Sequence, residues 1–468
     1  MFSSAYYIHS PLWAQEAMIA VRERIQLALR ENRRFDRVLS EIQGTQWLDK
    51  EALQSLQETR LVAIVQHAVQ NVRYYRDLFR REGWDARDFR SVKDLRLLPI
   101  ITKKDILADP GAFVAGNFRR PRFRVSTSGT TGTPLTFYQD LEAIIREHAF
   151  VRRHLLWAGL QRGQRRAWFR GEMVVPVQQR EPPFWRLNRP VNMLMLSSYH
   201  LSAVNAESYI RVLEGFDPVV IQAYPSSISF LASSLVNLSR HYKGQSLRGI
   251  VTSSETLTAR QKTVVESRFK CRVFDQYGSA EKVIMAGTCE AGTQHLEVDY
   301  GFAEYLDCGD GSAELVGTGF YNRVMPLIRY RIGDRVVLKD QPERCACGRS
   351  MPIVERVEGR LDDYLITLDG RQVRFAYAFK GVTNVVEAQI IQSKVGEITV
   401  VVVPAEKFSQ LDRVKIIRNA RERLGEDTQV DIQIVGGIPR GPNGKFRAVV
   451  CNLQSVNANA VKPTDSGT

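Results

Sequence analysis

The chain has 468 residues, of which 44% are hydrophobic and 25% are charged. A chain of this length and composition can bury a large core and divide into two or three domains, which excludes a small disulfide-stapled module and a wholly disordered chain. Lys and Arg number 65 and Asp and Glu 51, so the net charge is +14. This balance favours anionic partners (nucleic acid, acidic lipid, nucleotides or coenzyme A) without choosing among them.

The sequence shows no sign of membrane insertion or export. No apolar run reaches the roughly 18 residues that span a bilayer, and the first residues lack the basic-then-apolar order of a secretory signal. We therefore expect a cytoplasmic protein with no membrane span. Six cysteines are too few for a secreted scaffold, so closely spaced cysteines are expected to form metal or reactive sites rather than disulfides.

The first part of the chain, residues 1–110, is predicted to be mainly helical. Apolar residues recur there at helical spacing, as in Leu53, Leu56, Leu61, Ile64, Val65 and Ala68. From residue 122 to about 360, short β-rich runs alternate with helical stretches such as 141–160, which is typical of a sheet covered by helices. The predicted core is therefore of the α/β class, in a large domain spanning residues 1–359.

The last third of the chain follows a different pattern. Two β runs, at 385–392 and 397–404, precede a predicted helix at 409–424 and a further β run at 429–435. Ser409 and Asp412 suit the start of that helix and Gly425 its end. Its buried face is expected to comprise Leu411, Val414, Ile417, Ala420 and Leu424. This predicts a small, mobile α+β domain over 360–456, followed by a loose tail at 457–468.

The strongest local signal is the segment Ser126-Thr127-Ser128-Gly129-Thr130-Thr131-Gly132-Thr133-Pro134, between two β runs. Glycines let backbone N–H groups approach an anion closely, and the hydroxyl groups add donors, so such a loop can surround phosphate oxygens. The alternative is a flexible surface loop. The segment is not a Walker A loop, because no G-x-x-x-x-G-K-[ST] pattern occurs and a β run follows it.

Two further motifs each follow a β run: Ser253-Ser254-Glu255, and Tyr277-Gly278-Ser279-Ala280-Glu281. We expect both at the carboxyl ends of sheet strands, where open α/β sheets bind ligands. The second motif offers an aromatic ring for stacking, a tight turn and a carboxylate for Mg²⁺. The alternative is an ordinary strand-to-helix turn.

Three charged segments complete the candidate site. Asp334, in the run 329–335, can accept hydrogen bonds from two ribose hydroxyls, and residues 359–363 can form a hinge where the composition changes. The Gly/Pro-rich loop 439–447 presents Lys445. Taken singly, each segment is better explained as a charged turn or a solvated loop.

In their order and spacing, these six motifs resemble the adenylate-forming superfamily of acyl-CoA synthetases, luciferases and peptide-synthetase adenylation domains. The resemblance is greatest to the phenylacetate–coenzyme A ligase-like branch, which includes CapK-type capsule-biosynthesis proteins. The front segment is similar to that branch as well, in IVQHAVQNVRYYRDLFRREG and LRLLPIITKKDI. The resemblance therefore covers nearly the whole chain.

The resemblance implies a two-step reaction: a carboxylic acid and ATP give an acyl-adenylate, and the acyl group then passes to coenzyme A or to the thiol of a carrier protein. It implies a large ATP- and carboxylate-binding domain and a small lid domain that rotates about Asp362. It assigns catalysis to Thr130, Glu281 and Lys445, with Glu281 holding Mg²⁺. The ATP-binding residues that it implies are Ser126, Thr127, Ser128, Gly129, Thr130, Thr131, Gly132, Ser254, Glu255, Tyr277, Gly278, Ser279, Asp334 and Arg360.

The chain departs from the superfamily pattern at two points. Ala280 stands where a threonine is common, which removes one phosphate donor that Ser279 can replace. The loop at 126–134 does not end in the lysine that many relatives carry. These departures concern catalysis more than fold.

A structural zinc ion is also expected. Cys289 and His295 follow the second motif, and Cys345 and Cys347 precede the hinge. Together they supply four ligands, enough for a closed tetrahedral site with no open position for water. The alternative is free cysteines in turns, but the resemblance favours zinc, because relatives in this branch often carry a comparable cluster. Cys308 can substitute for one ligand, whereas Cys271 and Cys451 lie in β runs and are expected in the core.

The expected function is thus an ATP-dependent acid–thiol ligase in capsule, exopolysaccharide or secondary-metabolite biosynthesis. Two alternatives remain: a non-catalytic nucleotide- or polyanion-binding protein on the same fold, and adenylation with transfer to an amine or a sugar hydroxyl. Tyr224 falls where the superfamily begins its acyl pocket and is otherwise a core residue. The sequence is compatible with a homodimer, and we expect no specific nucleic-acid partner.

Overall fold

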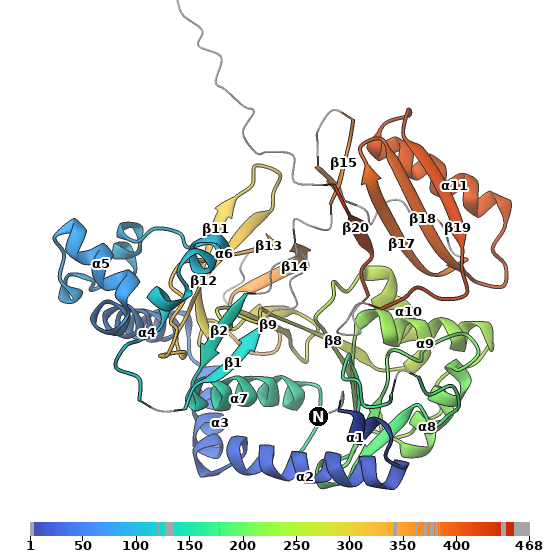
Figure 1. Ribbon diagram of the computed structural model, residues 1–468, viewed down its shortest axis with the longest axis horizontal. Coiled ribbons are helices and arrows are strands. Elements are labelled where there is room, and N and C mark those ends of the chain that lie inside the picture. The colour runs from blue at the N-terminus through green and yellow to red at the C-terminus, as the bar shows by residue number, and fades with distance from the viewer. Residues whose placement is uncertain are drawn as a thin grey trace, which may run out of the picture. The chain divides into compact units, whose positions relative to one another are not determined.

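The computed structural model describes residues 4–119, 121–126, 135–176, 178–339, 344–360, 364–368, 372–374, 379, 382, 384–440 and 446–453. They form two compact units that divide after Arg360. The first unit contains a large mixed sheet with helices, and the second contains a small sheet with one helix (Figure 1). This confirms the predicted fold class, a large α/β domain with a small α+β domain.

The lead segment is helical, as predicted. Its elements are α1 (Ala5–Ile8), α2 (Leu12–Arg30), α3 (Arg33–Thr45), α4 (Lys50–Asn71), α5 (Arg73–Glu82), η1 (Ala86–Asp88), η2 (Val92–Leu97), α6 (Lys103–Ala108) and η3 (Pro110–Phe113). Asp49 caps α4 by accepting a hydrogen bond from the N–H of Ala52 at 2.8 Å. The predicted apolar stripe on α4 is buried, except for Leu56, which is half-buried.

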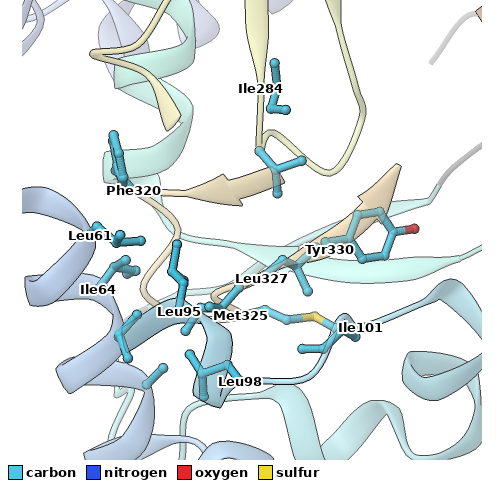
Figure 2. Close-up of a cluster of buried hydrophobic side chains, with 14 of the residues drawn as sticks. Leu61, Ile64, Leu95, Leu98, Ile101, Ile284, Phe320, Met325, Leu327 and Tyr330 are labelled. Carbon is cyan, nitrogen blue, oxygen red and sulfur yellow. The ribbon is translucent and has the colours of Figure 1, made fainter. Parts of the chain in front are cut away.

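That stripe packs into the core cluster shown in Figure 2. Leu61 and Ile64 of α4 lie beside Leu95 of η2, and this cluster also contains Met325 and Leu327. Each of these side chains is at most 3% exposed, and burial of one large apolar side chain contributes about 1.5–3 kcal/mol. The lead helices are thereby fixed against the segment that leads into β13 (Tyr330–Leu338), the strand that carries Asp334.

The large sheet has 12 strands in the order β11-β12-β13-β14-β10-β9-β8-β7-β6-β3-β5-β4. Strands β5, β3, β6, β7 and β8 run parallel, and the other pairs are antiparallel. The remaining bounds are β3 (Arg166–Phe169), β4 (Trp185–Asn188), β5 (Met193–Leu196), β6 (Val220–Ala223), β7 (Gly249–Ser253), β8 (Arg272–Gly278), β9 (Met285–Thr288), β10 (Gln294–Leu296), β11 (Gly301–Asp307), β12 (Ala313–Gly319) and β14 (Ile353–Arg360).

Helices cover this sheet. They are α7 (Leu141–Trp157), α8 (Ala206–Phe216), α9 (Pro225–Asn237) and α10 (Ala259–Phe269), with the short η4 (Arg189–Val191). Leu155, near the end of α7, packs against Val220, Val251 and Phe274 of three neighbouring parallel strands. Helices α8, α9 and α10 connect the parallel strands and pack against one another (Figure 1). A separate hairpin of β1 (Phe123–Ser126) and β2 (Thr136–Gln139) flanks the segment 127–134.

A buried ion cluster joins α7 to the segment after β10. The guanidinium of Arg153 donates to Asp299 Oδ2 and to Glu297 Oε2, both at 2.6 Å, and the three side chains are at most 1% exposed. Burial raises the pKa of Glu297 to about 7, although Arg153 opposes the shift. One guanidinium therefore holds two buried carboxylates that would otherwise repel each other.

Arg153→Met is expected to destabilise the protein by about 3–5 kcal/mol at pH 7, because it leaves two buried carboxylates without their cation. The folded pKa of each acid would then lie above its unfolded value, so the loss should shrink as the pH falls from 7 to 5. Urea unfolding at the two pH values measures both effects. The control is Arg162→Met, whose exposed pair with Asp36 spans 3.7 Å and should contribute little.

The second unit contains β15 (Tyr364–Ile366) paired with β16 (Gln372–Arg374), and a four-stranded sheet in the order β19-β18-β17-β20. The bounds of the latter are β17 (Val385–Lys394), β18 (Glu397–Pro404), β19 (Gln429–Ile434) and β20 (Val449–Cys451). Helix α11 (Gln410–Leu424) packs on this sheet through Ile416, and the predicted capping box of Ser409 and Asp412 is present.

The predicted buried face of α11 is wrong at its start. Leu411 and Val414 are 73% and 53% exposed. Asp412 is instead turned inward, where it accepts hydrogen bonds from Ser409 and from Asn384. The buried face then continues in steps of four residues through Ile416 and Ala420. The cap thus sets which face of the helix meets the sheet.

Two cysteines also differ from expectation. Cys271 and Cys451 are half-buried rather than core residues, and Cys271 precedes β8 instead of lying within it. Cys308 lies apart from the other cysteines and contacts the carbonyl of Leu306.

Among the helices of the described ranges, none combines the length and the apolar character needed to cross a bilayer.

Candidate functional site

The parallel strands end at one edge of the large sheet, and the predicted motifs lie at that edge. Ser254 and Glu255 follow β7, and Tyr277 and Gly278 end β8. Tyr224 follows β6, the other neighbour of β7. The predicted positions of these two motifs at carboxyl strand ends are therefore confirmed. No helix follows Tyr277-Gly278-Ser279, because the chain turns back into β9, so the alternative of a strand-to-helix turn is wrong.

Tyr277 and Asp334 are brought together although they lie on strands that are not neighbours in the sheet. The Tyr277 hydroxyl donates to Asp334 Oδ2 at 2.6 Å, and Asp334 is 7% exposed. Strands β14, β10 and β9 lie between β13 and β8 in the sheet order. A flat sheet would hold β8 and β13 roughly 19 Å apart at the usual strand spacing, so the sheet must curve to close this contact.

Arg360 is placed in the same region by strand register. In the pairing of β13 with β14, Asp334 lies opposite Arg360. The backbone of Arg360 is described, whereas its side chain is not. The structure therefore joins the backbone positions of two residues that the sequence predicted to act on the ribose.

Glu281 lies in the turn between β8 and β9 and is 7% exposed. Its Oε1 accepts a hydrogen bond from the Tyr330 hydroxyl at 3.3 Å. Its Oε2 and the nearby Ser279 Oγ are buried without a hydrogen-bond partner in the described part of the chain. A buried carboxylate oxygen is costly to leave unpaired. The donor set fits Mg²⁺, which prefers oxygen ligands and binds through one or two carboxylates.

Ser254 and Glu255 contact the segments that follow β3 and β6. Ser254 has a φ of 72° and its Oγ accepts a hydrogen bond from Arg170 Nη2 at 2.7 Å. Glu255 Oε2 accepts from the N–H of Ser226 at 3.0 Å, in the first turn of α9. Glu255 thus caps α9. Tyr224 is 6% exposed, and burial raises its pKa.

Sequence reasoning missed Arg170, which follows β3 at the same edge. Its guanidinium carbon lies 4.9 Å from the ring centroid of Trp168 and 5.7 Å from that of Tyr224. The signal was present, because a cation directly follows the β run RAWF, and β3 pairs in parallel with β6. What the sequence could not supply was the sheet order that places Arg170 beside Tyr224 and near Ser254.

The predicted phosphate loop and lid residues lie outside the described residues. They are Thr127, Ser128, Gly129, Thr130, Thr131, Gly132, Asp362 and Lys445. Ser126 is described, at the end of β1, where it pairs with Thr136 across the hairpin.

The four predicted zinc ligands lie together. One ligand atom from each of Cys289, His295, Cys345 and Cys347 falls within 4.8 Å of all the others. The sheet explains this grouping: Cys289 follows β9, His295 lies in β10, and the segment with both other cysteines leads into β14, which pairs with β10. Strand pairing therefore brings together ligands that lie more than 50 residues apart in the sequence.

The histidine of this cluster is oriented by its neighbours. His295 is fully buried, and its Nδ1 lies 3.0 Å from the carbonyl oxygen of Met351. A carbonyl only accepts, so Nδ1 carries the proton and Nε2, 3.4 Å from Cys347 Sγ, keeps its lone pair. Such an orienting hydrogen bond is typical of metal-ligating histidines. The donor set of three thiols and one imidazole fits Zn²⁺.

Arg349 supports the loop of this cluster and was also missed from sequence. Its guanidinium carbon lies 4.6 Å from the Trp47 ring and 4.2 Å from the Trp157 ring, and Nη1 pairs with Glu290 at 2.6 Å. The Arg349 carbonyl accepts from the N–H of Cys345 at 2.9 Å. The cysteine loop is thereby tied to the lead helices and to α7.

Comparisons with known proteins agree with this architecture. The family model described as the CapK C-terminal domain matches residues 365–452. Protein CapK of Staphylococcus aureus is 26% identical over 453 residues, which cover 96% of this chain and 99% of the relative. A phenylacetate-coenzyme A ligase of Thermus thermophilus is 26% identical over 446 residues, covering 86% and 97%.

A solved structure of 2-hydroxyisobutyryl-CoA ligase, in the postadenylation state with R3-HIB-AMP, is similar with a TM-score of 0.65. It is 17% identical and covers 87% of this chain and 91% of that chain, so this likeness concerns the fold. The fold is thus that of a CoA ligase of the adenylate-forming type. The sequence similarity to CapK and to the phenylacetate-CoA ligases extends over most of the chain and supports its assignment to their branch of the adenylate-forming superfamily.

Proposed function

We propose that this protein is an ATP-dependent carboxylate-activating ligase. A carboxylate oxygen of the acid attacks the α-phosphorus of ATP, the bond to the β-phosphate oxygen breaks, and pyrophosphate leaves. A thiol of coenzyme A or of a carrier protein then attacks the acyl carbon and releases AMP. The observation that carries this proposal is the contact of Tyr277 with Asp334, together with the buried Glu281 carboxylate in the turn that follows Tyr277.

Each residue has a defined task in this proposal. The Tyr277 ring stacks on adenine, and Asp334 accepts hydrogen bonds from the ribose hydroxyls with help from Arg360. The Ser279 hydroxyl donates a hydrogen bond to a phosphate oxygen. It takes the role of the threonine that is common in the superfamily at the position of Ala280. Mg²⁺ held by Glu281 supplies charge neutralisation at the phosphates. Electrostatic stabilisation dominates such a reaction, because two anions meet and charge accumulates on phosphate oxygens.

The remaining roles in this proposal are assigned from the sequence alone, to residues of the predicted phosphate loop and lid. Thr130 and its neighbours donate to the triphosphate, Lys445 bridges the carboxylate and the α-phosphate, and Asp362 is the hinge between the half-reactions. We place the reaction in the cytoplasm and in capsule, exopolysaccharide or secondary-metabolite biosynthesis, with the relatives of the CapK branch as support. The acyl group could instead be transferred to an amine or a sugar hydroxyl. A screen of acceptors would distinguish these reactions from transfer to a thiol.

The test is ATP–pyrophosphate exchange with purified protein and a panel of aromatic, short-chain, fatty, amino and sugar acids. Exchange that depends on one class of acid supports the proposal and names that class. A protein that binds ATP but exchanges with no acid contradicts it. In that case, a strong salt-dependent affinity for DNA would favour the second candidate, a polyanion-binding protein, for which the net charge of +14 is the motivating observation.

We also propose that Cys289, His295, Cys345 and Cys347 hold a structural zinc ion. Four protein ligands leave no position for a reacting water. The ion would hold the start of β14 to the β9–β10 hairpin, and β14 ends at Arg360 opposite Asp334. It would thus keep in register the strand that reaches the proposed ribose site.

Metal analysis is expected to find about one zinc per chain. Cys345→Ser should lower the zinc content to well below half an equivalent and lower the melting temperature. The matched control is Cys308→Ser, because Cys308 lies outside the cluster. A wild-type zinc content far below one equivalent, or an unchanged content in Cys345→Ser, would refute the site.

A further inference from the structure

Arg170 occupies an unusual position for a charged residue. It directly follows β3 at the edge where the parallel strands end, and its side chain is half-buried. Burial lowers its pKa, since desolvation disfavours the charged form. The guanidinium group lies near the rings of Trp168 and Tyr224, and it donates one hydrogen bond, to Ser254 Oγ. A cation thus lies beside Tyr224, the residue that the family resemblance places at the start of the acyl pocket.

Within the described residues, no carboxylate forms an ion pair with Arg170. Glu172 and Glu255 act on it only through longer-range attraction, and Glu255 is engaged by the N–H of Ser226. The fully buried guanidinium groups of this unit have more partners: Arg153 contacts two carboxylates and Arg349 contacts Glu290. Arg186 has no ion pair in the described chain, but it donates to the side chains of Gln15 and Gln179 and to two backbone carbonyls. Arg170, in contrast, is half-buried and donates a single hydrogen bond within the described chain. A partly desolvated charge is stabilised by an ionic partner, so the unused donors of Arg170 point to an anionic ligand.

The surroundings of Arg170 offer further unused polar groups. Ser198 Oγ, Ser226 Oγ and Ser227 Oγ are buried without a hydrogen-bond partner in the described chain. Ser198 follows β5, the strand beside β3, and the next residue, Tyr199, donates to the carbonyl of Gly171 at 3.2 Å. Ser226 and Ser227 lie in the first turn of α9, whose N-terminus favours negative charge. Polar groups at these strand ends suit a polar acid better than a wholly apolar one.

We propose that Arg170 determines the acid specificity of this site, and that the preferred substrate is a dicarboxylic acid. One carboxylate is activated, and the guanidinium group of Arg170 binds the distal one. This inference rests on the proposed carboxylate-activating function. A guanidinium group can hold a carboxylate through two parallel N–H donors, and Arg170 uses only one side-chain donor within the described structure. The rings of Trp168 and Tyr224 would exclude water from the pair and strengthen it.

The test compares matched acids in ATP–pyrophosphate exchange: phenylacetate against 4-carboxyphenylacetate, and hexanoate against adipate, with shorter and longer pairs of the same kind. The wild-type protein is expected to prefer one of the diacids by about 10-fold or more in kcat/KM. Arg170→Met should reduce that preference by about 10–100-fold, with the KM for ATP unchanged. Arg170→Lys should retain part of this preference, because lysine keeps the positive charge but lacks the two parallel N–H donors of the guanidinium group.

The matched control is Arg166→Met, which replaces a half-buried arginine at the opposite end of β3 and should leave the ratio between the two acids unchanged. Circular dichroism and thermal melting confirm that each variant is folded. An unchanged acid ratio in Arg170→Met would overturn the proposal. A raised KM for ATP with an unchanged acid ratio would also overturn it, because Arg170 would then serve the nucleotide phosphates instead.

Failure of the proposed function gives a different result. If no acid supports exchange, binding of adipate and 4-carboxyphenylacetate is measured by calorimetry in the wild-type and Arg170→Met proteins. Binding that requires Arg170 would support the diacid site in a protein without adenylation. Binding that is absent or independent of Arg170 would overturn the diacid site as well.

Discussion

Lys445→Ala is expected to reduce acid-dependent ATP–pyrophosphate exchange by about 10²–10³-fold, the usual cost of removing one preorganised donor from developing charge. The fold and ATP affinity should change little, because a lysine in a Gly/Pro-rich loop contributes little to a core. ATP binding by calorimetry and exchange at saturating ATP separate the two effects. A loss confined to exchange would place Lys445 at the reacting atoms.

The control for this variant is Lys407→Ala, an exposed lysine of the small unit. It should exchange at the wild-type rate. Undiminished exchange by Lys445→Ala would show that this loop does not close over the reaction, and the assignment of catalysis to Lys445 would be wrong.

Glu281→Gln is expected to lower exchange by about 10²-fold or more and to raise the Mg²⁺ concentration needed for half-maximal activity. The amide is nearly isosteric, and its oxygen can still accept from the Tyr330 hydroxyl, so folding should be preserved. The carboxylate charge, however, is lost at the buried oxygen that has no partner in the described chain. Exchange rates over a Mg²⁺ titration measure the effect.

Glu297→Gln is the matched control, because Glu297 is also buried in this unit and has one oxygen without a partner in the described residues. Its pairing with Arg153 makes it a stability residue. It should therefore alter the unfolding midpoint and leave the Mg²⁺ dependence unchanged. Equal Mg²⁺ responses in the two variants would contradict a metal-binding role for Glu281.

Much of the fold could be predicted because it depends on local patterns. The apolar spacing of α4, the alternation of β runs and helices, and the change of pattern near residue 360 are all visible in the chain. The capping box of α11 was likewise predictable, since it involves residues three apart. The buried face of the same helix was not, because Asn384 and the sheet determine which side of α11 is turned inward.

The candidate site divides in the same way. The sequence by itself identified the residue types and their order: hydroxyl groups and glycines for phosphate, Tyr277 and Asp334 for the nucleoside, and a Cys/His set for metal. It could do so because side-chain chemistry and spacing belong to the chain. It also placed two motifs at strand ends, since a strand end is a local feature.

Only the tertiary structure decided which of these groups meet. The curvature of the large sheet closes the contact between Tyr277 and Asp334, and strand pairing gathers the cysteines around His295. The parallel order of β3, β6 and β7 places Arg170 beside Tyr224 and Ser254 without a carboxylate partner in the described chain. Contacts of this kind depend on strand order and twist, which arise from packing between distant segments and leave no mark in the spacing of residues along the sequence.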